Sequence, residues 1–365
     1  MGHRKRLTRH AIAAVLASGC LSACAAAPAT AAPSGPAPSL TCGTWLCQTN
    51  SASMGQRLFF HELDASGQRA NDAGIRYRGF HDASGAPLTL SIDGDAHRIV
   101  GTDAQGAALR GDALVGAVLV LEDTSTRERF DVAIKAVGEI DFWVHPREKV
   151  PTYVFEYRPQ VARPGDPEGR RFQPLCTGRD VPAEWNEKSP GTTTQLALIF
   201  TGDRYDPRTK TVTVGPSDWF NVACAGSALA KMHLLRHTYA GSFGEQDPTD
   251  VEQRQAMLKM LTDDICGTGY SFTVDGEAVF YADRKGWHPF APAGSPPASV
   301  GSIEAIWTKD GAICLDEARR LAEEPTIAAA IAAECRTPLP TCQSLGYDLT
   351  NWSAKPDHYG ISANP

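Results

Sequence analysis

Alternation of apolar and polar residues predicts short β-strands in the first half of the chain. Residues 88–92 read Leu, Thr, Leu, Ser and Ile, the pattern of a strand with one buried face. Four further segments show similar patterns: 97–102, 113–122, 130–137 and 153–157. Turns that contain glycine separate these segments. We therefore expect a mostly-β domain over residues 42–160.

The pattern becomes mixed after a segment rich in Pro, Gly and charged residues at 159–169, which we interpret as a domain boundary. Apolar spacing predicts three helices: 225–236, 248–265 and 326–334. Turn residues and alternation predict a strand at 219–224 and three hairpins: 194–214, 271–281 and 303–315. The tail at 346–365, rich in Pro, Asn and Tyr, is expected to be mostly irregular.

The predicted fold class is therefore α+β. A mostly-β N-terminal region is followed, over residues 161–345, by a disulfide-stabilised α+β domain with an antiparallel helix pair and hairpins.

The first residues have the pattern of an export signal. Four basic residues precede a short apolar stretch at 11–16: Arg4, Lys5, Arg6 and Arg9. This stretch is far shorter than the roughly 20 apolar residues of a membrane-spanning helix, so we exclude it from the fold. The expected signal peptide covers residues 1–23.

Leu21-Ser22-Ala23-Cys24 has the form of a lipobox, in which a branched apolar residue and two small residues precede the cysteine that is acylated. We expect a lipid on Cys24 and a tether of Pro, Ala and Ser over residues 24–41. The chain would then be a lipoprotein of the cell envelope, which we place at the outer membrane. The alternative is ordinary secretion, with cleavage after a small residue such as Ala23 or Ala31.

Composition and net charge limit the classes of partner that the protein is expected to bind. A hydrophobic content of 42% and a charged content of 21% are typical of a globular protein. The formal net charge of −7 includes four basic residues of the signal, so the remaining chain is still more acidic. An acidic body argues against a nucleic-acid partner and against attachment through a basic surface. We expect membrane contact through the N-terminal lipid only.

The cysteines indicate disulfides. Ten are present, and eight remain when Cys20 and Cys24 are set aside: Cys42, Cys47, Cys176, Cys224, Cys266, Cys314, Cys335 and Cys342. An even number in an exported chain is typical of a disulfide framework, and the absence of a CxxC pair argues against a zinc ribbon or a redox site. Close spacing favours Cys42–Cys47 and Cys335–Cys342, while the sequence leaves the other pairings open.

Several residues of the second half resemble the ADYC domain, a domain of exported and often lipid-anchored bacterial proteins named for an Ala-Asp-Tyr-Cys motif. Cys224 stands at the start of a predicted helix, and Asp264, Cys266 and Gly267 close the next one. The segment 303–314 is also similar. The likeness covers about residues 150–345, although only the aspartate and the cysteine of the naming motif are kept.

The resemblance also implies a disulfide arrangement. Relatives of this kind have cysteines where this chain has Met232 and Met257. In an antiparallel helix pair these two positions would face each other, so a contact between methionines would replace one bridge. The implied remaining bridges are Cys224–Cys266 and Cys176–Cys314. The resemblance implies no particular reaction.

Two groups of residues suggest chemistry. His233 and His237 have the i, i+4 spacing that metal sites on helices use, but no glutamate lies between them as a general base, so we expect no metal. Asp263 and Asp264 close a helix, where acidic side chains oppose the helix dipole. We interpret Asp264 as making a structural hydrogen bond to nearby backbone, with a catalytic carboxylate as the alternative.

Other motifs are weaker still. Ser227 lacks the second glycine of a GxSxG motif, and no glycine-rich phosphate loop is present, so we expect no cofactor and assign no catalytic residue. Trp287, His288 and Phe290 lie in a proline-rich loop at 286–297 and could form an exposed contact edge. Packing of that loop onto the body is the preferred interpretation.

We therefore expect an exported, lipid-anchored protein that acts as a non-enzymatic binding or surface-display module. Its partner would lie in the envelope or outside the cell, in contact with the 286–297 loop or with the face of the β-domain. The alternative is an extracytoplasmic hydrolase that uses Asp264 or a metal held by His233 and His237.

Overall fold

The structure is a computed structural model of the chain. It describes the following residues: 51–52, 54, 60–144, 148–161, 171–176, 196–216, 218–238, 249–273, 279–288, 300–322 and 324–364. The chain divides into two units, 1–41 and 42–365, and every described residue belongs to the second. The predicted signal peptide, the tether, Cys24, Cys42 and Cys47 therefore lie outside the described residues.

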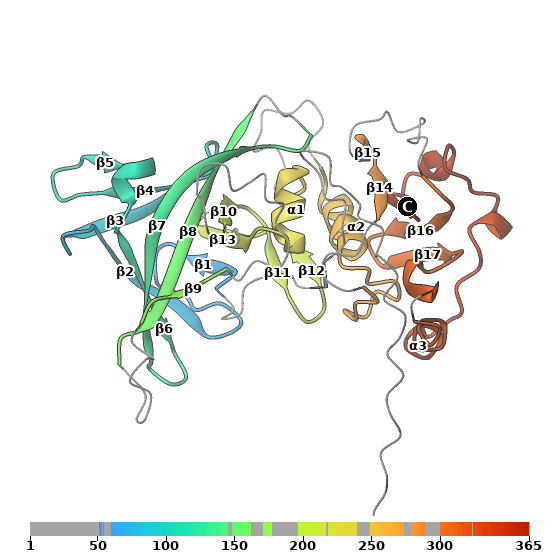
Figure 1. Ribbon diagram of the computed structural model, residues 1–365, viewed down its shortest axis with the longest axis horizontal. Coiled ribbons are helices and arrows are strands. Elements are labelled where there is room, and N and C mark those ends of the chain that lie inside the picture. Colours follow the sequence, from blue (N-terminus) through green and yellow to red (C-terminus); the bar gives the residue numbers. More distant parts are fainter. Residues whose placement is uncertain are drawn as a thin grey trace, which may run out of the picture. The chain divides into compact units, whose positions relative to one another are not determined.

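The largest element is an eleven-stranded antiparallel sheet with the order β1-β13-β10-β8-β7-β6-β2-β3-β4-β5, in which β9 pairs with β8 (Figure 1). Its strands are β1 Glu62–Asp64, β2 Ile75–His81, β3 Pro87–Asp93, β4 Arg98–Thr102, β5 Ala108–Leu109, β6 Val118–Asp123, β7 Arg129–Asp141, β8 Lys149–Pro159, β9 Gln173–Pro174, β10 Leu196–Thr201 and β13 Trp219–Cys224. A 3₁₀ turn, η1 Gly111–Leu114, precedes β6.

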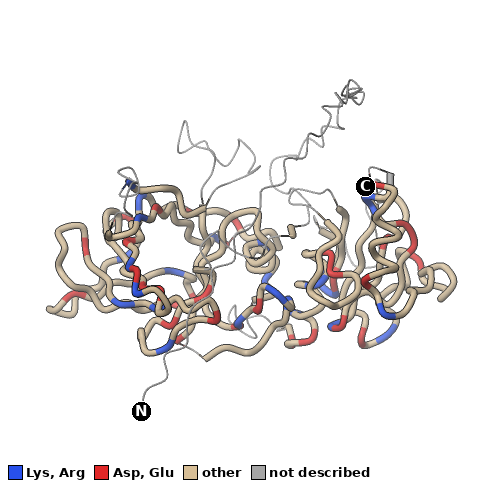
Figure 2. The backbone as a smooth tube through the Cα atoms, turned by 90° about the horizontal axis from the view of Figure 1, so that it is seen from below, with Lys and Arg blue, Asp and Glu red and all other residues tan. Residues whose placement is uncertain are grey.

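Alternating side chains explain this sheet. In β3, Leu88 and Leu90 are buried while Thr89 and Ser91 are exposed, so the predicted alternation is confirmed. The buried side chains form one core that draws on most strands, for example Leu63, Phe80, Ile99, Leu119, Ile134, Phe155, Ile199 and Phe220. The edge strand β1 also contacts β2, because the sheet curves around this core (Figure 2).

A second sheet has five strands in the order β15-β14-β18-β16-β17. Its strands are β14 Phe280–Asp283, β15 Gly286–His288, β16 Ile303–Thr308, β17 Gly311–Leu315 and β18 Gly360–Ala363. The central strand β18 comes from the tail that we expected to be irregular, and this expectation was wrong for residues 360–363. All four residues of β18 are buried, and Ser362 Oγ accepts a hydrogen bond of 3.0 Å from Trp307 Nε1.

Three helices are present among the described residues, where three were predicted: α1 Ala228–Leu234, α2 Val251–Leu261 and α3 Ile327–Glu334. Ser227 and Asp250 cap α1 and α2 by accepting backbone N–H bonds. The two helices pack on each other, and α2 also contacts β16, β18 and the short strand β12, Thr211–Thr213. Three short 3₁₀ segments are η3 Arg319–Ala322, η4 Gln343–Leu345 and η5 Trp352–Ala354. Within the described part of the chain, no helix has the length and apolar character required to cross a bilayer.

The predicted hairpins meet different outcomes. The hairpin at 303–315 is confirmed as β16–β17, which turns at Lys309-Asp310. The hairpin at 194–214 is wrong: β10 pairs with β8 and β13, and the hairpin is the small ribbon of β11 Arg204–Asp206 and β12 Thr211–Thr213. For 271–281, the observed hairpin lies later, between β14 and β15, and the expected turn lies outside the described residues.

The expected boundary near residue 160 falls within the large sheet, because β8 before it pairs with β10 after it. The fold class is confirmed in a coarser form. The chain is strongly β-rich and α+β-like, and its described part holds three disulfides.

The six described cysteines form three disulfides, as expected for cysteines of an exported chain. The pairs are Cys176–Cys224, Cys266–Cys335 and Cys314–Cys342. The predicted pairs Cys224–Cys266, Cys176–Cys314 and Cys335–Cys342 were wrong. The error has a structural cause: Cys224 ends strand β13 and does not begin a helix, and it lies beside Cys176, which follows β9 in the same sheet.

Candidate functional site

The motif residues form the turn that follows α2. Asp264 is fully buried, and its carboxylate accepts the backbone N–H of Gly269 at 2.9–3.1 Å. The predicted structural hydrogen bond is therefore confirmed. Lys259 Nζ donates to Asp264 Oδ2 at 2.6 Å, so the carboxylate is neutralised by a buried cation. This arrangement gives Asp264 a structural role and leaves it no contact with solvent.

Lys259 joins two turns. Besides Asp264, its ammonium donates to the carbonyl oxygens of Thr209 at 2.9 Å and Gly267 at 3.4 Å. Gly267 has a φ of +69°, and a Cβ there would lie 1.9 Å from the carbonyl oxygen of Asp310. Glycine is therefore required at position 267, because any side chain would push the motif turn away from the β16–β17 turn. The motif turn is thus clamped against the turns of two hairpins.

Lys210 and Ser271 meet beside this clamp. Lys210 lies in the β11–β12 turn and is 3% exposed, and its Nζ donates a hydrogen bond to Ser271 Oγ. Burial lowers the pKa of Lys210 to about 8; the carboxylate of Asp264 opposes this shift and the neighbouring Lys259 ammonium adds to it. Sequence reasoning missed this pair, because 61 residues separate the two and no local motif marks either one.

The two histidines with helical spacing do not share a site. Helix α1 ends at Leu234, so His237 lies beyond it and points elsewhere. His233 stacks on Phe200 with ring centroids 4.5 Å apart, and its Nδ1 lies 3.0 Å from Thr238 Oγ1. Within the described ranges, no group of His, Cys, Asp and Glu could hold a metal ion. The described contacts therefore place His233 and His237 in different surroundings and give no support to a shared metal site.

His237 instead belongs to a buried network with the β14–β15 hairpin. Asp283 Oδ2 lies 2.5 Å from His237 Nε2 and 3.2 Å from His288 Nε2. Burial alone would raise the pKa of Asp283, but the two histidines more than offset this and hold it well below its usual range. The network therefore ties the segment after α1 to the five-stranded sheet.

The predicted contact loop is packed where the structure describes it. Trp287 is 1% exposed and His288 is 4% exposed, so neither is available as a surface contact. This agrees with the preferred interpretation that the loop packs onto the body. Phe290 lies outside the described residues.

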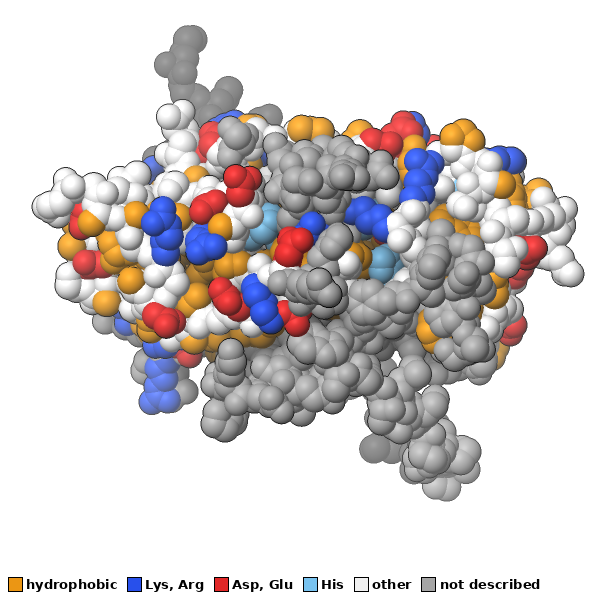
Figure 3. Space-filling model, turned by 90° about the horizontal axis from the view of Figure 1, so that it is seen from above, with side chains coloured by type: hydrophobic (Ala, Val, Ile, Leu, Met, Phe, Trp, Pro, Cys, Tyr) orange, Lys and Arg blue, Asp and Glu red, His pale blue; other side chains and the backbone are white. Residues whose placement is uncertain are grey.

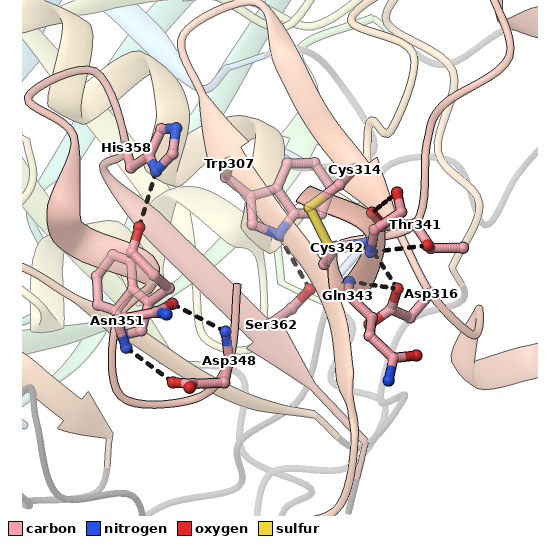
Figure 4. Close-up of a disulfide and its surroundings, with 12 residues drawn as sticks. Trp307, Cys314, Asp316, Thr341, Cys342, Gln343, Asp348, Asn351, His358 and Ser362 are labelled. Carbon is pink, nitrogen blue, oxygen red and sulfur yellow. Dashed lines mark hydrogen bonds between the residues drawn. A yellow bond between two sulfur atoms is a disulfide. The ribbon is translucent and has the colours of Figure 1, made fainter. Parts of the chain in front are cut away.

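A further network holds the tail beside β17 (Figure 4). The disulfide Cys314–Cys342 joins β17 to η4, and Asp316 Oδ1 accepts the backbone N–H of Cys342 at 2.6 Å. Farther along, His358 Nδ1 bonds to the carbonyl oxygen of Trp352 at 2.8 Å. These contacts fix the chain that leads to β18, and they are structural.

The outer side of the large sheet carries many charges. We define the charged face by ten residues: Arg76, Arg78, Glu122, Arg127, Arg129, Asp131, Lys135, Glu156, Arg158 and Phe172. Three arginine side chains, which are 37–76% exposed, surround Glu122 at 3.3–3.5 Å: Arg78, Arg127 and Arg129. Arg158 pairs with Asp131 at 3.0 Å and lies over the ring of Phe172 at 4.4 Å. Basic and acidic side chains also lie side by side on the surface drawn in Figure 3.

Cations exceed carboxylates on the charged face. Its ten residues include six basic and three acidic side chains, whereas the whole chain has a net charge of −7. The Nε atom of Arg76 is buried, and no described residue accepts a hydrogen bond from it. Sequence reasoning expected contact at the face of the β-domain but did not identify these residues, because the strands β2 and β6 that carry several of them pair non-sequentially.

Comparison with known proteins identifies one family. The ADYC domain matches residues 111–321, more than half of the chain. The match begins at η1, earlier than the expected start near 150, and it includes the strands β6 to β8 of the large sheet. It ends before α3, although the expected likeness extended to about 345. No curated protein and no solved structure matches the chain. The chain therefore belongs to the ADYC domain family.

Proposed function

We propose that this protein is an exported, lipid-anchored binding module and that its contact surface is the charged face. The three disulfides indicate an extracytoplasmic protein, because such bonds persist in oxidising compartments. The lipobox at Cys24 would supply the anchor, and the segment 24–41 would act as the tether between lipid and folded body.

The observation that carries the proposal is the excess of exposed basic groups on the charged face. A guanidinium has five N–H donors, whereas the single carboxylate of Glu122 is shared by three arginines. Donors on these three exposed arginines therefore remain for a further acceptor. An envelope or extracellular partner that presents acidic groups fits this surface.

Crosslinking on intact cells, followed by mass spectrometry, tests the surface. We expect a recurrent partner whose crosslinks map to the charged face. Capture should fall by about tenfold, equivalent to 1.4 kcal/mol, in an Arg78→Gln/Arg129→Gln variant. Arg110→Gln removes an exposed charge outside the charged face and should leave capture unchanged. Equal capture by all three proteins, or crosslinks that map elsewhere, would exclude the charged face as the contact surface.

A separate experiment tests the anchor. Cys24→Ala should release the protein from the membrane fraction and abolish incorporation of a labelled fatty acid. If the variant remains in the membrane fraction, or if the wild type takes up no fatty acid, the lipid anchor is wrong. Secretion would then be the better account.

A further inference from the structure

We propose that Ser271 is a nucleophile for acyl transfer and that Lys210 is its general base, so that the chain can hydrolyse carboxylic esters. This activity goes beyond the proposed binding function and does not depend on it. It also differs from both hydrolase sites that the sequence suggested.

The geometry brings together two groups that lie far apart in sequence. The carbonyl oxygen of Lys210 accepts a hydrogen bond of 2.7 Å from Gln255 Nε2 of α2, and the Nζ of Lys210 reaches Ser271 Oγ. The backbone N–H of Phe272 donates to the carbonyl oxygen of Asp263 at 3.0 Å, which fixes the neighbouring Ser271 against the motif turn. The backbone of Lys210 is therefore held by a side chain of α2, and the backbone next to Ser271 is held by the turn that follows α2.

The motif turn supports this arrangement. Lys259 holds Thr209 and Gly267, the neighbours of the pair, through its hydrogen bonds to their carbonyl oxygens. At Gly269 a Cβ would lie 2.0 Å from the carbonyl oxygen of Arg208, so the two turns touch through backbone. Lys210 itself adopts a φ of +52°, a conformation that costs a non-glycine residue energy and persists where the surroundings impose it.

A serine hydroxyl becomes a useful nucleophile when an adjacent base takes its proton. Lys210 is suited to this role, because burial lowers its pKa to about 8, so that the neutral amine is more abundant at mildly alkaline pH than for an exposed lysine. In the charged form Nζ donates to Oγ, as the structure shows. In the neutral form the hydroxyl rotates and donates its proton to the nitrogen lone pair.

The reaction then balances without a further reagent. As Ser271 Oγ bonds to the ester carbonyl carbon, its proton passes to Lys210 Nζ; the bond to the leaving alcohol breaks and Nζ returns the proton to that alcohol. Water attacks the acyl-serine by the same proton route and releases the acid. Ser271 is half-buried, and the neighbouring Tyr270 is 55% exposed and packs against Phe272 with ring centroids 4.9 Å apart. Tyr270, supported from below by the buried Phe272, offers an exposed apolar ring for the acyl group.

Labelling with an alkyl fluorophosphonate tests the proposal. The reagent forms a P–O bond to a nucleophilic serine, breaks its P–F bond and releases fluoride and the hydroxyl proton. We expect one phosphonyl group per chain, located on Ser271 by peptide mass spectrometry. Lys210→Arg keeps the charge but cannot act as a base, and should slow labelling on the order of 100-fold. Ser271→Ala should abolish it, whereas Ser344→Ala, at an exposed serine, should not change it.

The pH profile of the wild type provides a second measurement that does not depend on whether the variants fold. Labelling should rise with pH around the pKa of Lys210, about 8. If Ser271 reacts no faster than exposed serines, or if Lys210→Arg labels at the wild-type rate, the pair is only a structural link between two turns. A rate that does not change between pH 6 and pH 9 would lead to the same conclusion.

Discussion

At the scale of single residues, the most consequential feature is the number of buried charges with dedicated partners. Lys259 and Asp264 form one such pair, and Arg254 with Asp203 forms another beside the same helix. Moving a charge from water into the protein interior costs free energy. The attraction between the two partners offsets this cost only while both are present. Replacing one partner alone therefore lowers the free energy of unfolding by much more than the intact pair contributes to it.

Lys259→Met should show this asymmetry. The substitution leaves Asp264 buried without its cation and removes the hydrogen bonds to the carbonyl oxygens of Thr209 and Gly267, so we expect a loss of about 3–5 kcal/mol in the free energy of unfolding. Urea denaturation under oxidising conditions measures it. Lys309→Met breaks an exposed ion pair with Glu252 and should have little effect. Equal stability of the two variants would contradict the assigned role of Lys259.

At the scale of elements, the disulfides fasten chain segments that the sheets alone do not hold. Cys266 and Cys335 join the motif turn to the end of α3, with Cα atoms 4.9 Å apart and a sequence separation of 69. Helix α3 buries only Ile327 and Ile331, because alanines fill most of its other positions. This helix is therefore expected to depend on its disulfide more than α1, all of whose residues are buried.

Removing the Cys266–Cys335 disulfide should lower the free energy of unfolding and should affect α3 most. A Cys266→Ala/Cys335→Ala variant is expected to lose about 2–5 kcal/mol, mainly because the unfolded chain gains freedom. Hydrogen exchange should show α3 opening before α1. Peptide mapping of the unreduced wild type should link Cys266 to Cys335 and Cys176 to Cys224. A peptide that links Cys224 to Cys266 would refute the observed arrangement.

At the scale of the whole molecule, buried histidines make stability depend on pH. Burial lowers the pKa of four histidines, in the case of His97 to about 4: His61, His97, His233 and His237. Below pH 6.5 the unfolded chain binds protons at these sites and the folded chain does not, so the free energy of unfolding falls as the pH falls.

The loss should begin near pH 6.5 and continue to about pH 4, with His97 alone contributing about 3 kcal/mol. Urea denaturation at several pH values between 8 and 4 measures the slope. His97→Asn removes one titrating group, and asparagine tolerates the φ of +50° at this position, so the slope should become shallower. A free energy of unfolding that stays constant between pH 7 and pH 5 would contradict this account.

The complete fold also shows which elements could be predicted from the sequence and which could not. Alternation found β3 because its leucines face one core and its polar residues face solvent. It missed β18, since Gly360 to Ala363 are buried on both sides and show no alternation. The motif turn was found through Asp264 and Cys266, which are close in sequence. The pair of Lys210 and Ser271 and the true disulfides depend on contacts between distant segments, which local patterns do not encode.

The position of β18 has a consequence for how a newly made chain matures. Strands β14 and β16 each pair with β18, which follows β16 by about fifty residues. If the chain is exported in the order of its sequence, it must hold two open strand edges until residue 360 arrives, and such edges invite aggregation. The bond between Cys314 and Cys342 can form earlier. It leaves only about twenty residues between Cys342 and β18, which shortens the loop that must close before β18 can pair. A chain interrupted between these two events would be an aggregation-prone substrate for chaperones and proteases.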